Sequence, residues 1–556
     1  MKMINIKKLA LATATLLVLG TGCSNDYDIN APTEDLTAGS LNYRDVLPAA
    51  INNSARIVAA DWKFLQNWMG YWARSGNYQN VADEETYQFT NTFPAAGGNG
   101  AGNPWTDLYY NASNYEYVLK NAQADGSGFY EAICRIMKAH NFQILTDVYG
   151  NIPYKEALKG NDLRTPKYDN GADIYKDLFR QLDTAIALLK DPVASSLDRN
   201  QKITTNDLVF KGSASGWIKF ANTLKLRMLV HAYEVPEIDK AAEIAIIDAE
   251  GSGYLGAGET AKINPGYSSA KPNPFFRAFA INENGVLSGL ADLTKANSFA
   301  VGLGSAGTPG YYRWDGDPRE SKFYIRPDIN TDPAVYTPAA FHKGIPYGAI
   351  SGFAPGFGGE SLSSINQINA INPTLAPNTG LTPAGAASDA WIITSVESLF
   401  LQAEARERNI ITTGASAESR LTDAIRESFV FLGLTAAQAD TYVANNATYP
   451  DVDYNGVPQG PGLPGGGIYT ILSQKWFALN GIAPFEIWTD YRRTDIVYGE
   501  GGGFDPGPPI STLVGAAPTI PVRLFYPQSE YSFNEANVQA QGNIDVFTSR
   551  VFWDRN

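Results

Sequence analysis

Two short stretches of the chain combine aromatic rings with amides, carboxylates and a guanidinium group. One runs from Trp68 to Asn80, and the other is Tyr311 to Asp315 beside a Gly-rich loop. Rigid rings stack on the apolar faces of sugars, while amides and carboxylates hydrogen-bond to hydroxyl groups. This chemistry makes five aromatic residues candidates for ligand binding: Trp72, Tyr78, Tyr311, Tyr312 and Trp314.

The spacing of the first stretch also fits a structural role. Trp68, Tyr71 and Trp72 would share one stripe of a helix, and aromatic residues at helical spacing usually face the core. Tyr78 lies beyond Gly76, which favours exposure. Both interpretations therefore stay open for Trp72, whereas three adjacent aromatic residues in a loop favour a binding surface for the second stretch.

A third pattern resembles the first half of a calcium-binding loop. Asp451, Asp453 and Asn455 place side-chain oxygens at its first, third and fifth positions. The twelfth position is Gly462 instead of a bidentate Glu, so a turn-rich acidic loop is the alternative. These three residues are candidate calcium ligands, and we expect no other cofactor.

Enzyme motifs are missing from the sequence. Residues 302–307 match the letters of a dinucleotide fingerprint, but Thr308-Pro309-Gly310 prevents the helix that must hold the pyrophosphate. No Walker loop, nucleophile elbow or His-Glu-x-x-His motif occurs. We predict that the protein is not an enzyme; a surface glycoside hydrolase is the alternative, since the acidic residues are too many to exclude a catalytic pair.

The N-terminus indicates export. A basic segment, Met1–Lys8, precedes the apolar run Leu9–Leu19, which is too short to cross a bilayer as a helix. Small residues then lead to Cys23, in a pattern that resembles the lipid-attachment signal of bacterial lipoproteins. We predict a signal peptide over residues 1–22 and a lipidated tether over 23–40, attached through Cys23; a plain secretory signal is the alternative.

Composition limits the partners. The chain has 556 residues, 44% of them hydrophobic, so it can bury a large core. Its formal net charge of −14 disfavours nucleic acid, which is bound by neutralising phosphates. Two cysteines cannot form a disulfide framework.

The elements that must position these residues are mostly helices. Apolar residues recur at helical spacing from Ile174 to Leu189, with Asp173 as the expected N-cap and Pro192 beyond the end. Between 251 and 390 the chain is rich in Gly, Pro and Asn, and we expect long loops with short strands there. We predict one mostly α domain over 41–556, with packed helical hairpins at 41–250 and 391–556. Helices are expected over Phe129–Tyr149, Asp173–Lys190, Ser213–Tyr233, Thr394–Arg408, Glu418–Leu432, Ala436–Asn446 and Ile468–Leu479.

Several of these segments together resemble the SusD/RagB family of nutrient-binding outer-membrane lipoproteins. Their order spans about 400 residues and follows the lipoprotein signal. The matching segments are Arg135–Pro153, Phe210–Tyr233, the Glu397 to Ala405 helix with Gln402, Ala403 and Glu404, Gln474-Lys475-Trp476 with Glu486 to Arg493, and the closing motif Arg523 to Glu530 with Asn534.

The resemblance implies a TPR-like helical scaffold and a role without covalent chemistry. Such proteins are anchored by lipid on the outer face of the outer membrane and cap a SusC-type TonB-dependent transporter like a lid. Their ligands are mostly oligosaccharides, with oligopeptides in some branches, and residues 251–390 are implied to select the ligand. A helical scaffold that only holds other surface proteins together is a further alternative.

Overall fold

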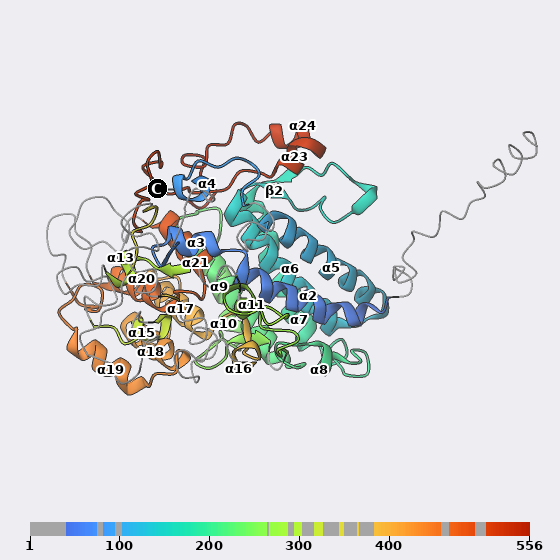
Figure 1. Cartoon of the computed structure of the whole chain (residues 1–556). Coiled ribbons are helices and arrows are strands. Elements are labelled where there is room, and N and C mark those ends of the chain that lie inside the picture. Colours follow the sequence, from blue (N-terminus) through green and yellow to red (C-terminus); the bar gives the residue numbers. More distant parts are fainter. Residues whose placement is uncertain are drawn as a thin grey trace, which may run out of the picture.

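The computed structural model describes residues 41–74, 82–94, 103–263, 266–286, 288, 294–302, 316–325, 344–349, 364–365, 383–456, 466–494 and 508–555. Most of the regular structure in these residues is helical (Figure 1). The helices of the N-terminal half are α2 (Tyr43–Ala60), α3 (Lys63–Trp68), α4 (Ala82–Thr86), α5 (Pro104–Asp125), α6 (Gly128–Tyr149), α7 (Gly171–Lys190), α8 (Ile203–Asn206), α9 (Ala214–His231) and α10 (Lys240–Glu250), with a 3-10 turn at Gly160–Asp162.

The remaining helices include several of a single turn. They are α11 (Pro274–Phe279), α13 (Ser298–Val301), α15 (Glu320–Phe323), α16 (Pro383–Ala386), α17 (Ser395–Glu407), α18 (Ala417–Phe431), α19 (Ala436–Asn445), α20 (Gly467–Ala478), α21 (Pro484–Arg493), α23 (Gln528–Phe533) and α24 (Glu535–Gln539).

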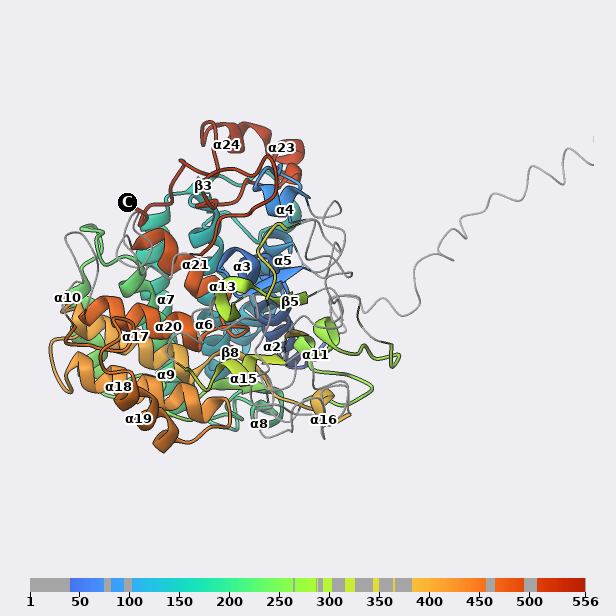
Figure 2. The ribbon, with the colours of Figure 1, turned by 60° about the vertical axis from the view of Figure 1, so that its left-hand side comes forward.

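The long helices form two groups that meet at α9. In the first group α6 packs between α5 and α7, and α2 packs on α5; in the second, α18 packs between α17 and α19, and α20 packs on α17. In Figure 1 the two groups lie on opposite sides of the molecule with α9 between them, and in Figure 2 helices α17, α18, α19 and α20 gather at the lower left. Helix α9 contacts α6 and α7 on one side and α17 on the other, so it joins the groups.

The predicted helices are confirmed with ends shifted by one or two residues. In α7 the stripe from Ile174 to Leu189 is buried as expected. The expected N-cap is wrong: the side chain of Asn170 accepts a hydrogen bond from the Ala172 amide, and Asp173 lies in the first turn. An acidic side chain there is still favourable, because it faces the positive end of the helix dipole.

The loop-rich region has the short strands that its composition predicts. Strands β1 (Trp72–Arg74), β5 (Thr294–Ala296), β7 (Ser364–Ile365) and β6 (Tyr324–Ile325) form one antiparallel sheet in that order. Strand β4 (Ala261–Ile263) pairs with β8 (Ala390–Ile393), which ties the two ends of this region together at the scaffold. A second two-stranded sheet, β2 (Ile152–Pro153) with β3 (Tyr168–Asp169), follows α6.

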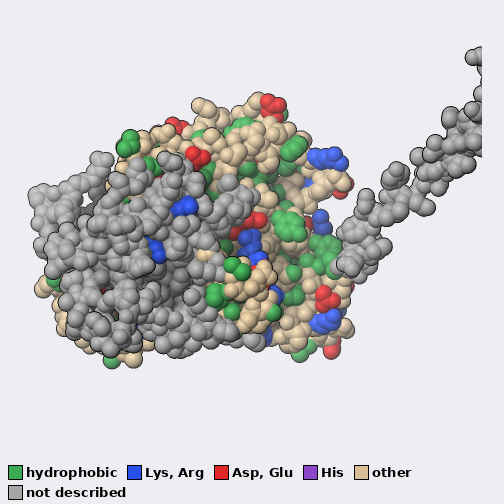
Figure 3. All heavy atoms as spheres, viewed as in Figure 1, with side chains coloured by type: hydrophobic (Ala, Val, Ile, Leu, Met, Phe, Trp, Pro, Cys, Tyr) green, Lys and Arg blue, Asp and Glu red, His purple; other side chains and the backbone are tan. Residues whose placement is uncertain are grey.

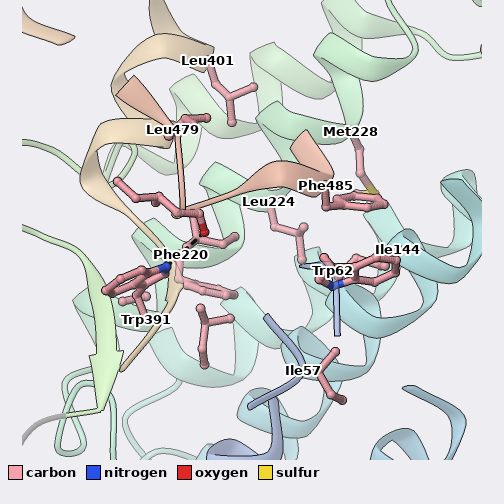
Figure 4. Close-up of a cluster of buried hydrophobic side chains, with 14 of the residues drawn as sticks. Ile57, Trp62, Ile144, Phe220, Leu224, Met228, Trp391, Leu401, Leu479 and Phe485 are labelled. Carbon is pink, nitrogen blue, oxygen red and sulfur yellow. Dashed lines mark hydrogen bonds between the residues drawn. The ribbon is translucent and has the colours of Figure 1, made fainter. Parts of the chain in front are cut away.

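A continuous hydrophobic core runs through both helix groups. Figure 4 shows part of it, where α9 supplies Phe220, Leu224 and Met228 between residues of the two groups. Trp62 packs on Phe485 with ring centroids 5.3 Å apart, which joins α21 to the segment between α2 and α3. Core burial of this kind is the main favourable term in folding. No helix among the described residues is long and apolar enough to cross a membrane.

Candidate functional site

A network of charged side chains lies enclosed where the two helix groups meet. We call it the ionic centre. It is fully or almost fully buried and is formed by α6, α9, α17, α20 and α21 through Asp147, Arg227, His231, Glu397, Glu404, Lys475, Glu486, Asp490 and Arg493.

The pairing in the ionic centre is continuous. Both amino groups of Arg493 donate to Glu404 at 2.6 Å, and one of them also donates to Asp490 at 2.6 Å. The Lys475 ammonium bridges Asp490 and Glu486 at 3.0 and 2.7 Å. Bidentate charged hydrogen bonds of this kind are the strongest that side chains form. Arg493 thus pairs with acids inside the fold, whereas its neighbour Arg492 donates to backbone carbonyls and to the Thr489 hydroxyl.

The network continues to α6 and α9 through a histidine. His231 Nε2 lies 3.0 Å from Glu486, and Nδ1 lies 3.0 Å from Asp147. Arg227 donates to Glu397 at 3.0 Å, which links α9 to α17. Asp147 also accepts a hydrogen bond from the Trp553 indole at 2.7 Å, so the C-terminal segment is tied to the same network.

Neighbouring charges keep Lys475 and Glu404 ionised, whereas burial raises the pKa values of Glu397 and Asp490. Burial alone would lower the pKa of Lys475, but the nearby Asp490, Glu486 and Glu404 carboxylates hold it above its ordinary value. Burial would raise the pKa of Glu404, yet Arg493 and Arg408 hold it far below its ordinary value. Because its charges pair with one another inside the fold, the network serves to position helices.

The first predicted ligand stretch forms a corner of packed aromatic rings. Trp68 is fully buried between Phe64 and Phe93, and its indole donates to the Glu84 carbonyl at 3.2 Å. Tyr71 stacks on Trp476 with centroids 4.7 Å apart. The expected core role of Trp68 is therefore confirmed.

Trp72 has the same role, and its candidacy as a stacking platform is corrected. Its side chain is 3% exposed in β1 and packs edge to face against Phe275 and Phe279 of α11. With its ring enclosed, Trp72 has no free face on which a sugar could stack. Of the two roles that the sequence left open for Trp72, packing in the core is therefore the one observed, although the residue lies in a strand and not in a helix.

Buried polar groups surround this aromatic corner. Arg74 ends β1 opposite Thr294 of β5 and is 8% exposed, and Lys63 and Glu85 are also buried. Arg74 Nε and Nη1, Thr294 Oγ1 and Glu85 Oε2 have no hydrogen-bond partner in the described part of the chain. Buried polar groups are almost always paired, so unpaired ones call for a functional explanation. We call Lys63, Arg74, Glu85 and Thr294 the polar corner and take it as the candidate functional site.

Burial shifts the pKa values of two groups in the polar corner, Glu85 and Lys63. Burial, reinforced by the neighbouring Glu84, raises the pKa of Glu85 to about 9. Burial lowers the pKa of Lys63, although the Glu84 carboxylate partly opposes this. At neutral pH the corner therefore presents a protonated Glu85 beside the Arg74 guanidinium, which suits hydrogen bonding to polar, uncharged groups.

The other predicted site residues lie outside the described residues. They are Tyr78, Tyr311, Tyr312, Trp314 and the lipid-attachment residue Cys23. Their roles stay predictions.

The calcium candidates form a compact turn. The Asn455 amide donates to the Asp453 carboxylate at 3.0 Å, and the Asn455 side chain donates to Glu418 at 3.1 Å. Asp451 is 2% exposed, and its backbone carbonyl accepts from Gln474 at 2.9 Å. In the described ranges no three His, Cys, Asp or Glu side chains gather closely enough to hold a metal ion.

Sequence reasoning missed most of the polar corner. Only Arg74 belongs to a stretch that the sequence singles out. Lys63 could have been found as a lone cation inside the apolar segment Trp62–Trp68, since a buried lysine needs compensation. Glu85 and Thr294 carry no such local signal.

Comparison with known proteins identifies relatives by sequence and by fold. The sequence model of a family described as "Starch-binding associating with outer membrane", which is SusD-like, matches residues 44–527. No curated protein matches the chain.

Solved structures share the fold over nearly their full length. A chitin-binding SusD homologue from Flavobacterium johnsoniae is 21% identical in sequence and aligns with a TM-score of 0.67. The alignment covers 93% of this chain and 99% of the homologue. A SusD-like protein from Bacteroides thetaiotaomicron is 20% identical, with a TM-score of 0.66 and the same coverage. A SusD homologue from Parabacteroides distasonis is 18% identical, with a TM-score of 0.68, and 93% and 98% of the chains are covered.

The ionic centre generates a stability prediction. Changing Glu404→Gln leaves the buried Arg493 guanidinium with half of its pairing, so the free energy of unfolding should fall by ~3–5 kcal/mol. The matched control is Asp440→Asn, which breaks the exposed pair of Arg426 and Asp440 and should cost less than ~1 kcal/mol. Denaturant unfolding of both variants measures the difference, and equal small losses would show that the ionic centre is not needed for stability.

The polar corner predicts a pH dependence. Because the pKa of folded Glu85 is raised to about 9 from an unfolded value of 4.5, the folded state binds the proton more tightly between these values. Stability should therefore fall as the pH rises from about 5 to about 9. Glu85→Gln should reduce this fall, and denaturant unfolding at several pH values measures it. An unchanged pH profile in the variant would contradict the assignment.

Proposed function

The chain belongs to the SusD-like family, and we propose that it is a non-catalytic surface lipoprotein that binds a nutrient oligomer and delivers it to a transporter. The observation that carries this proposal is the family match over residues 44–527, which include the long helices of both groups. The fold supports it, since SusD homologues align with this chain over 98–99% of their own length. Residues from four of the five motif segments also meet in the ionic centre, and the closing motif packs elsewhere.

An oligosaccharide is the ligand we propose. The polar corner offers a guanidinium, a protonated carboxyl and a hydroxyl, which are groups that bind sugar hydroxyls. The relative from Flavobacterium johnsoniae is described as chitin-binding, so chitin oligosaccharides are the first ligands to test. An oligopeptide ligand in the same role is the alternative, and a surface glycoside hydrolase is a more distant one.

We further propose that the protein acts as the lid of a SusC-type TonB-dependent transporter. Lipid on Cys23 would hold it to the outer membrane, with the folded part facing the exterior. The polar stretch that follows Cys23 would serve as a flexible tether. In this role binding and delivery need no covalent chemistry.

The lid role predicts a stable partner. The tagged protein, extracted from membranes in mild detergent, should copurify with a large TonB-dependent barrel that mass spectrometry identifies. Extracts from cells with untagged protein serve as the control. Recovery of the protein without any such barrel would contradict the lid role.

Cys23→Ser should release the protein from the membrane fraction, because the variant lacks its lipid anchor.

Ligand binding predicts a role for Trp314. If this ring stacks on a sugar, Trp314→Ala should weaken binding of the best oligosaccharide by ~1–3 kcal/mol, by analogy with aromatic stacking elsewhere. The control is Tyr110→Ala, since Tyr110 is an aromatic residue of α5 that is 65% exposed. Titration calorimetry measures both affinities. If no oligosaccharide or oligopeptide binds, or if both variants bind alike, the loop does not form the site and a scaffold role gains support.

A further inference from the structure

A pocket opens on the far side of α11 from Trp72. Helix α11 turns Phe275 and Phe279 toward Trp72, while Pro274, Arg277 and Ala278 of the same helix line the pocket. The opposite wall is α2, and the segment 266–273 closes one side. Figure 3 shows a small group of basic and acidic side chains at the middle of this face, where α2 and α11 lie in Figure 1.

The pocket has the size of a small-ligand site. Its volume is about 480 Å³, within the ~300–1,000 Å³ that is usual for small-molecule pockets. Its lining alternates between apolar surface and polar groups. The polar groups are Asn52, Arg56, Tyr267, Lys271, Arg277 and Glu283.

Both guanidinium groups that line the pocket are held in place by carboxylates. Arg277 pairs with Glu283 through two contacts, at 2.7 and 2.8 Å. Arg56 pairs with Asp61 at 2.8 Å and with Asp107 at 3.3 Å. A guanidinium fixed by a carboxylate presents its remaining donors in a rigid plane, beside the acceptor oxygens of its partner. A donor and an acceptor that lie side by side in this way suit two hydroxyl groups on neighbouring carbons of a sugar.

A second observation concerns Tyr267. Its side chain lines the pocket, yet its hydroxyl is enclosed and has no hydrogen-bond partner among the described residues. Because the hydroxyl is closed to solvent, it offers a ligand no hydrogen bond, and the contribution of Tyr267 to the pocket is its ring. The Tyr267 ring, with Pro272 and Pro274, also supplies the apolar surface on which the C–H face of a sugar ring can rest.

The charges favour a neutral ligand. Arg277 is balanced by Glu283, and Arg56 lies between Asp61 and Asp107, so Lys271 is the lining cation left without an ion pair in the described structure. An apolar ligand would cover these ion pairs and remove the hydrogen bonds that water makes to them. It would offer no hydrogen bonds in return, and burying charged groups in this way is costly. A strongly acidic ligand would meet the carboxylates that already occupy the guanidinium groups.

We propose that this pocket is a subsite for one neutral pyranose unit, separate from the polar corner. The ring rests on Tyr267 and the two prolines, and its neighbouring hydroxyls bind the Arg277–Glu283 pair and Asn52. The proposal rests on the proposed function, because it assumes a carbohydrate ligand, and it adds a second contact point for that ligand on α2 and α11.

The test uses single sugars, because the pocket holds about one unit. Saturation-transfer NMR with the full-length protein would compare glucose, galactose, mannose, xylose and N-acetylglucosamine. We expect at least one of them to bind, and Arg277→Gln should weaken that binding about tenfold, as expected for the loss of a charged hydrogen bond. Asn52→Ala should weaken it as well, without touching the ion pair.

The matched control is Arg426→Gln. Arg426 forms an exposed pair with Asp440 on another helix, much as Arg277 pairs with Glu283, so both variants should stay folded. Arg426→Gln should leave sugar binding unchanged. The subsite is overturned if none of the five sugars binds, or if both pocket variants bind like the control. Copurification of the transporter and binding of oligosaccharides measure the proposed function separately, so its failure and the failure of the subsite can be told apart.

Discussion

The fold depends on buried charges that cancel only when α9, α17, α20 and α21 lie in one register. Arg493 needs Glu404 from α17, and Lys475 of α20 needs Glu486 and Asp490 from α21. A charge taken out of water is tolerated only when it is paired and hydrogen-bonded. A shift of one helix by a single turn would leave at least one of these charges alone. The ionic centre thus specifies how the two helix groups meet, while the surrounding hydrophobic core supplies most of the driving force.

This constraint explains why the sequence motifs that identify the family contribute so many buried residues. Glu397 and Glu404 on α17 and Glu486 to Arg493 on α21 point into the interior, where they hold helices together. The closing motif acts similarly, since the Tyr526 hydroxyl donates to the Asn151 carbonyl just after α6 at 2.8 Å. The motifs describe the scaffold. On the proposed function, ligand choice is left to what the scaffold carries, namely the polar corner, the pocket beside α11 and the loop-rich region.

Net charge and local charge have separate consequences in this protein. The formal charge of −14 acts at long range and disfavours polyanionic partners, subject to screening by salt. In the pocket beside α11, Arg277 and Glu283 lie side by side and balance each other, while at the polar corner Arg74 lies beside an uncharged Glu85. Recognition at contact distance depends on these local pairs. A protein that repels polyanions can therefore still present guanidinium groups to an uncharged sugar.

The sequence by itself determined the family and seven helices between α6 and α20, but α2 and α5 were not among the helices that it predicts. The stripe from Ile174 to Leu189 predicts α7 because helical hydrogen bonds join residues four apart, so the pattern is local. Helix α10 escaped prediction because only Ile244 and Ile247 of its residues are buried, which leaves no extended stripe. Tertiary structure alone decided the site. Trp72 looks equally suited to a core and to a binding surface until α11 covers it, and Arg74 meets Thr294 only through strand pairing. Whether a ring or a charge is buried depends on which distant residues surround it, and a local sequence pattern does not contain that information.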